Sequence, residues 1–85
     1  MKHAGEATLA VLEDLLKEIR KFGDLTEKKR GIFYRKATAF LHFHEDKSGL
    51  FADVKVGSKY KRYSVSSRAE QREVLKAIQV QLKNP

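Results

Sequence analysis

The sequence predicts an α+β domain of two layers, in which two helices pack on one face of a four-stranded antiparallel sheet (α-β-β-β-β-α). Apolar residues recur at helical spacing near both ends of the chain. The segment between them is rich in aromatic and β-branched residues and is divided by short turn sequences, which is typical of an antiparallel meander. A chain of 85 residues buries one modest core, so we expect residues 1–85 to form a single small domain.

The first helix is predicted over residues 8–22, because leucine and isoleucine recur there at intervals of three and four positions. Thr8 is the expected N-cap, and Gly23 is expected at the C′ position, where glycine tolerates a left-handed conformation. Residues 24–31 are predicted to form a connecting loop that ends in a cluster of three basic residues and a glycine.

Four strands are then predicted, over residues 32–35, 38–45, 50–56 and 59–65. Gly57-Ser58 separates the last two strands, and glycine at the first position of a two-residue loop suits a type II′ hairpin. The second helix is expected to begin after Ser67, because Ser67 and Glu70 have the spacing of a capping box. Its apolar stripe consists of Val74, Leu75, Ile78 and Leu82.

Side chains alternate between the two faces of a strand, so Leu41 and Phe43 are expected to face the helices, and His42 and His44 to face away. A four-residue loop after Glu45 sets the expected pairs Leu41–Val54, His42–Asp53, Phe43–Ala52 and His44–Phe51. The Gly57-Ser58 turn then places Arg62 beside Asp53, and Tyr60 beside Lys55. A turn at Lys36-Ala37 would place Phe33 beside Phe40, with Ile32 and Tyr34 pointing inward.

We therefore predict an interaction face on the side of the sheet away from the helices. Its expected members are Phe33, Phe40, His42, His44, Phe51, Asp53, Lys55, Tyr60 and Arg62. This is more aromatic area than a solvated sheet face normally shows, and contiguous exposed apolar surface marks interaction sites. The sequence thus favours a non-enzymatic domain that contacts another protein or a second copy of itself. The alternative is that a helix or the N-terminal segment covers this face.

Nucleic-acid binding is the second functional hypothesis, because Lys and Arg number 18 against 11 Asp and Glu, a net charge of +7. The candidate phosphate contacts are Lys28, Lys29, Arg30, Arg35, Lys36, Lys59 and Lys61. Residues 36–43 partly resemble the ribonucleoprotein motif of RNA-recognition domains, with Lys36 as the leading cation and Phe40 and Phe43 at the fifth and eighth places. The helix–strands–helix order is similar to that of double-stranded-RNA-binding domains.

No metal site, cofactor or catalytic group is predicted. His42, His44 and Asp53 are the candidate metal ligands. The spacing in the sequence fixes only the two histidines relative to each other and fixes no third ligand, and His3 is the one other histidine. The simpler interpretation of these residues is a charge network in which Asp53 bridges His42 and Arg62. Nothing in the sequence positions the hydroxyl of Ser64 or Ser66 as a nucleophile, and there is no glycine-rich phosphate loop.

The chain lacks cysteine, which is consistent with a cytoplasmic protein. No apolar run approaches the length of a membrane span, and the first residues lack the apolar core of a signal peptide. Residues 40–46 (Phe-Leu-His-Phe-His-Glu-Asp) and 49–54 (Gly-Leu-Phe-Ala-Asp-Val) resemble a segment of a group of small bacterial proteins. The layout is loosely similar to that of MmcQ/YjbR-like proteins, and neither resemblance implies an activity.

Overall fold

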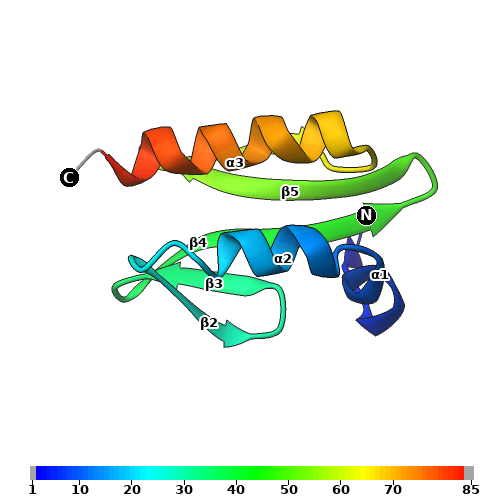
Figure 1. Ribbon diagram of the computed structural model, residues 1–85, viewed down its shortest axis with the longest axis horizontal. Helices are drawn as coiled ribbons and strands as arrows, with labels where there is room; N and C mark the ends of the chain where they lie inside the picture. Colours follow the sequence, from blue (N-terminus) through cyan, green and yellow to red (C-terminus); the bar gives the residue numbers. More distant parts are fainter. Residues whose placement is uncertain (1, 84–85) are drawn as a thin grey trace.

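The computed structural model describes residues 2–83 and has the predicted α+β architecture, with α2 and α3 on the same side of an antiparallel sheet (Figure 1). The elements are β1 Lys2–His3, α1 Glu6–Val11, α2 Glu13–Ile19, β2 Leu25–Lys29, β3 Ile32–Arg35, β4 Thr38–Asp46, β5 Gly49–Val56, β6 Lys59–Ser64 and α3 Arg68–Leu82. The four predicted strands are confirmed to within one residue at each end, and β1 and β2 extend the predicted sheet. No helix within residues 2–83 is long and apolar enough to cross a membrane.

The first helical segment is divided at Leu12 into α1 and α2, which run in different directions in Figure 1. The N-cap of α1 is Gly5, so the prediction that Thr8 caps a helix is wrong. Gly23 does not have a positive φ, and α2 ends at a C-cap in the right-handed helical region, so the predicted C′ glycine is also wrong. The predicted apolar stripe is confirmed. Its sixth member, Phe22, is partly buried against the core, and the other five are buried: Leu9, Leu12, Leu15, Leu16 and Ile19.

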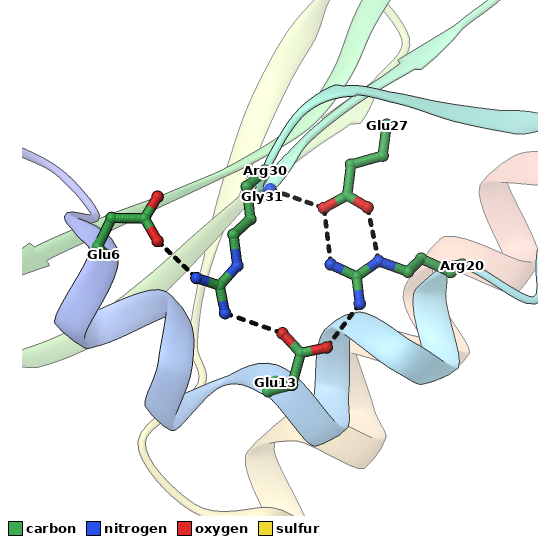
Figure 2. Close-up of polar contacts among 6 residues, drawn as sticks. All are labelled: Glu6, Glu13, Arg20, Glu27, Arg30 and Gly31. Carbon is green, nitrogen blue, oxygen red and sulfur yellow. Dashed lines mark hydrogen bonds and ion pairs between the residues drawn. The ribbon is translucent and has the colours of Figure 1, made fainter.

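Residues 24–31, predicted as a loop, contain strand β2, which pairs antiparallel with β3. The sequence of β2, Leu-Thr-Glu-Lys-Lys, has too few apolar residues to give a strand signal. Its position is set by polar contacts with the helical layer, which Figure 2 shows. These contacts join α1, α2 and the β2–β3 turn through Glu6, Glu13, Arg20, Glu27, Arg30 and Gly31.

Every charged group in this network except Glu6, which contacts Arg30 alone, has more than one partner. Arg20 donates from Nε to Glu27 Oε1 at 2.5 Å and from Nη1 to Glu13 Oε2 at 2.6 Å. Glu13 accepts again from Arg30 Nη2 at 3.0 Å, and the Gly31 N–H donates to Glu27 Oε2 at 2.8 Å. Gly31 also has a φ of +80°, and an added Cβ would lie 2.6 Å from a methyl carbon of Leu9, so glycine is required where this turn meets α1.

The predicted register of β4, β5 and β6 is confirmed. The pairs between β4 and β5 include Leu41↔Val54, His42↔Asp53, Phe43↔Ala52 and His44↔Phe51. Strand β6 continues the arrangement with Asp53↔Arg62 and Lys55↔Tyr60. In the turn between β5 and β6, Gly57 alone has a positive φ, +65°, as a type II′ turn requires. The capping box at Ser67 and Glu70 is also confirmed, with both reciprocal hydrogen bonds present.

A β-bulge between β3 and β4 changes which aromatic residues are buried. Phe33 pairs with Leu41 while Tyr34 pairs with Ala39, so Phe40 is an extra residue in β4. Residues on either side of a bulge no longer follow simple alternation. Phe33 and Phe40 are consequently 1% and 3% exposed and belong to the core, so their predicted place on the interaction face is wrong. The predicted pairing of Phe33 with Phe40 is wrong for the same reason.

Strand β1 occupies the part of β4 that β3 leaves unpaired. Strand β3 pairs with residues 38–41 of β4, whereas β1 pairs with its far end through Lys2↔Glu45 and His3↔His44. The N–H of Ala4 then donates to the Phe43 carbonyl at 3.0 Å, and the Gly5 N–H donates to Glu45 Oε2 at 3.0 Å. These contacts fix His3 beside His44.

The bulge predicts that two phenylalanines close together in the sequence have unequal effects on stability. Phe40→Ala removes a ring from the core and is expected to lower the free energy of unfolding by about 3–5 kcal/mol. Phe51→Ala, on a partly buried ring of the opposite face, is expected to cost about 1 kcal/mol. Urea denaturation of both variants measures the difference. Equal losses would contradict the placement of Phe40.

The network of Figure 2 predicts an acid-dependent loss of stability. Burial would raise the pKa of Glu27, but hydrogen bonds from Arg20 and the Gly31 N–H outweigh it, and its pKa is lowered. The pKa of Glu13 is lowered by its hydrogen bonds to Arg20 and Arg30. A lowered pKa stabilises the fold above the ordinary value of 4.5, and this contribution disappears as the pH falls through the folded-state pKa.

We therefore expect Glu27→Gln to lower the free energy of unfolding by about 1 kcal/mol at pH 7, and the difference from the parent protein to shrink towards pH 3. Denaturant titrations at both pH values test this. Glu73→Gln, which alters an exposed pair with Lys76 on α3, serves as the control and is expected to change little. A constant difference between the parent protein and Glu27→Gln at both pH values would argue against the network.

Candidate functional site

The side of the sheet opposite the helices, here called the outer face, holds seven of the nine residues predicted for it. These are His42, His44, Phe51, Asp53, Lys55, Tyr60 and Arg62. The other two predicted members, both phenylalanines, are buried. Two residues that were not predicted lie on this face instead: His3 of β1, which pairs with His44, and Tyr34 of β3, which pairs with Ala39. Tyr60 is the most exposed aromatic ring in the predicted set, at 42%, and its hydroxyl donates to the Ala39 carbonyl at 2.6 Å.

Asp53 lies at the centre of the outer face and is 7% exposed. Arg62, directly opposite on β6, donates from Nε to Oδ1 and from Nη2 to Oδ2, each at 2.8 Å. This two-contact geometry is the strongest form of an arginine–carboxylate pair. The hydrogen bonds from Arg62 lower the pKa of Asp53 against the effect of burial, so the carboxylate is ionised at neutral pH.

Two histidines contact this carboxylate, and a third histidine lies beside them. Nδ1 of His42 lies 2.9 Å from Nε2 of His44, and the latter atom lies 3.2 Å from Oδ2 of Asp53. The ring of His3 is 4.6 Å from that of His44 and 5.9 Å from that of His42, between ring centroids. The side chains of His42 and His44 are mostly buried, whereas His3 is exposed.

Burial makes His42 and His44 hard to protonate. Desolvation is the main reason that the pKa of each is lowered, and the charge of Asp53 opposes this shift without overcoming it. Both rings are therefore neutral at pH 7, so each has one protonated nitrogen and one nitrogen that can accept a hydrogen bond. The predicted charge network exists, but its closest histidine contact is from His44 to Asp53; the His42 contact is 4.0 Å.

The basic residues predicted to contact phosphates have different positions. Arg30 belongs to the network of Figure 2, and Arg35 donates to the Gln81 and Leu82 carbonyls at the end of α3, so both contribute to the fold. Lys28 lies over the ring of Tyr34, with Nζ 4.5 Å from the centroid. Lys61 lies over Tyr63 on the other side of β6, with Nζ 5.2 Å from the centroid.

A shallow groove crosses the end of the sheet where the β3–β4 and β5–β6 turns meet. We call it the basic groove, and it is lined by Arg35, Lys36, Thr38, Phe40, Lys55, Gly57 and Gln81. Lys55 connects this groove with the outer face, because its Nζ also lies 5.4 Å from the ring centroid of Tyr60. Lys59 pairs with Val56 beside the same turn, while Lys29 lies at the far end of β2.

Two members of the site, His3 and Tyr34, were missed by sequence reasoning. A two-residue polar strand gives no periodicity, so nothing indicated that His3 would pair with His44. Tyr34 was expected to point inward, and that expectation is wrong because the bulge shifts the register of β3 against β4. The two candidate hydroxyl nucleophiles have structural contacts: Ser64 hydrogen-bonds to Glu70, and the Leu50 N–H donates to Ser66 Oγ at 3.0 Å.

Comparisons with protein-family models, with curated proteins and with solved structures find no match to this chain. The resemblance to small bacterial proteins therefore stays a prediction. The function has to be inferred from the outer face and the basic groove themselves.

The position of Asp53 predicts a shift in histidine titration. Its negative charge raises the pKa of His42 and His44 relative to burial alone, so Asp53→Asn is expected to lower both values further. Proton NMR titration of the ring resonances in chelator-treated protein measures this. Asp46→Asn, which changes an acid whose contacts are with the Ser48 turn, is the control. Unchanged values in Asp53→Asn would show that the carboxylate does not act on the rings.

Proposed function

We propose that this domain is a non-enzymatic binding module that holds single-stranded nucleic acid against the outer face and the basic groove. The observation that carries the proposal is the pairing of lysines with aromatic rings on a sheet face that the helices leave open: Lys28 with Tyr34 and Lys55 with Tyr60. Proteins that bind single strands combine cations for phosphates with aromatic rings on which bases stack. A cytoplasmic location is part of the same proposal.

The distribution of charge supports an anionic partner. The three helices carry six acidic residues and four basic ones, so the rest of the chain contributes a net charge of +9 to the total of +7. Asp53, the acid at the centre of the outer face, is neutralised by Arg62. The positive potential is therefore concentrated away from the helical layer, in the part of the molecule that includes the outer face.

The conformation of Lys36 supports a role for the basic groove. Lys36 has a φ of +58°, a left-handed conformation that a glycine adopts without strain and that costs other residues on the order of 1 kcal/mol. A lysine at this turn position places a cation beside Lys55 in the groove, despite that cost. Strain of this kind is found at functional positions, and here it accompanies the positive charge.

Protein contact, the first hypothesis from the sequence, receives less support from the geometry. It rested on four phenylalanine and tyrosine rings on the outer face, and two of these, Phe33 and Phe40, are in the core. Self-association through the unpaired edge of β6 is also disfavoured, because its exposed residues include Lys59 and Lys61. Lysine on an edge strand opposes pairing with another chain.

The test is the fluorescence anisotropy of labelled single-stranded RNA and DNA at 50 and 200 mM salt. We expect binding that weakens steeply with salt. The double variant Lys36→Gly/Lys55→Ala removes two cations of the groove, with glycine avoiding strain at the turn. It is expected to bind about tenfold more weakly and to lower the slope of log affinity against log salt by roughly 1.5.

The matched control is Lys17→Ala/Lys76→Ala, which lowers the net charge by the same two units on α2 and α3. We expect its affinity to stay within about threefold of the parent protein. Equal losses in both double variants would show that binding follows total charge and not the site. No binding at 50 mM salt, together with an increase in mass with concentration, would replace the proposal by self-association.

A further inference from the structure

Three imidazoles from two strands converge at the edge of the outer face. His42 and His44 lie two residues apart on β4, and the pairing of β1 with β4 places His3 opposite His44. One ring nitrogen from each of the three histidines lies within 4.8 Å of the other two. The full sequence contains three histidines, and all of them are in this cluster. Neutral imidazole nitrogens are common ligands for zinc and related divalent ions.

The spacing of the donor atoms suits one ion. Zinc bound tetrahedrally at about 2.0–2.1 Å has neighbouring ligand atoms about 3.3 Å apart. Nδ1 of His42 and Nε2 of His44 are 2.9 Å apart, and Oδ2 of Asp53 lies 3.2 Å from the latter and 4.0 Å from the former. The His3 ring nitrogen lies within 4.8 Å of the other two histidine nitrogens, so the exposed His3 ring would move closer to them when it binds the same ion. We propose that His3, His42 and His44 bind a single divalent ion of the zinc class, with the Asp53 carboxylate as the fourth ligand.

The surroundings of the cluster match those of a metal centre. Ligating side chains are held in place by further hydrogen bonds from their non-coordinating atoms. Arg62 contacts both oxygens of Asp53, and the ring of His44 also hydrogen-bonds to the backbone of Lys2. His42 is packed against the ring of Tyr60, with centroids 5.1 Å apart. Both His42 and His44 therefore have their ring orientations fixed before an ion arrives.

This proposal does not require nucleic-acid binding, because its ligands differ from the lysines and aromatic rings on which that proposal rests, although His42 contacts Tyr60. The bound ion would connect β1 to β4 and β5 through side chains, in addition to the backbone pairing. It would therefore stabilise the N-terminal segment as well as the sheet. The competing interpretation is a hydrogen-bonded network of three histidines and a carboxylate that binds no ion.

The experiment is a calorimetric titration of untagged, chelator-treated protein with Zn²⁺, and a parallel titration with Co²⁺ followed by visible absorption. We expect one ion per chain, an intense d–d band typical of tetrahedral Co²⁺, and a rise in the thermal midpoint with added Zn²⁺. His3→Phe keeps the ring contact with His44 but removes the ligand nitrogen. Its affinity for Zn²⁺ is expected to fall by more than about 100-fold, since even supporting residues cost 10- to 100-fold.

Lys2→Ala is the matched control for His3→Phe, because it alters the neighbouring exposed residue of β1 and leaves the three imidazoles in place. We expect it to bind Zn²⁺ like the parent protein. His42→Phe tests the second strand and is expected to lose binding as His3→Phe does, with circular dichroism reporting whether it folds. The proposal is overturned if the parent protein binds no Zn²⁺, or if His3→Phe or a folded His42→Phe binds it with unchanged affinity.

Discussion

The contact between the helical layer and one face of the sheet is the constraint on which the rest of the structure depends. Leu41, Phe43, Ala52 and Val54 are buried beneath the helices, and this burial fixes the register of β4 and β5. An 85-residue chain provides a single modest core, and no helix within residues 2–83 covers the other face of the sheet. The outer face is thus open as a result of core formation, and its polar and aromatic residues are free to bind a partner.

The bulge at Phe40 shows how the core and the outer face are related. Without the extra residue, β3 and β4 would place two more aromatic rings on the open side and leave Tyr34 inside. With it, Phe33 and Phe40 join the core, which a small domain needs for stability, and the outer face becomes less apolar. The same local irregularity thus adds to the packing of the core and removes two aromatic rings from the outer face.

The central strands, their register and the second helix could be predicted from the sequence because each rests on short-range patterns. Alternation specifies Leu41 and Phe43 against His42 and His44, and the capping box specifies the start of α3. What escaped prediction depends on contacts between distant residues. Strand β2 depends on Glu27 meeting Arg20, and β1 depends on the free end of β4, neither of which has a local signature. Three of the four proposed metal ligands, His42, His44 and Asp53, could be named as candidates from the alternating pattern and the expected register, and His3 could not.

The pairing of β1 with β4 also has a practical consequence for handling the protein. The first described residues lie beside the histidine cluster, while α3 finishes at the opposite end of the molecule, near the basic groove (Figure 1). A polyhistidine purification tag fused ahead of Lys2 would supply foreign imidazoles next to the native ones and obscure any intrinsic metal chemistry. A cleavable tag fused after α3 keeps the foreign imidazoles away from the histidine cluster, but it lies close to the basic groove. Metal binding is therefore best assayed with a tag at the C-terminus, and nucleic-acid binding with a tag at the N-terminus.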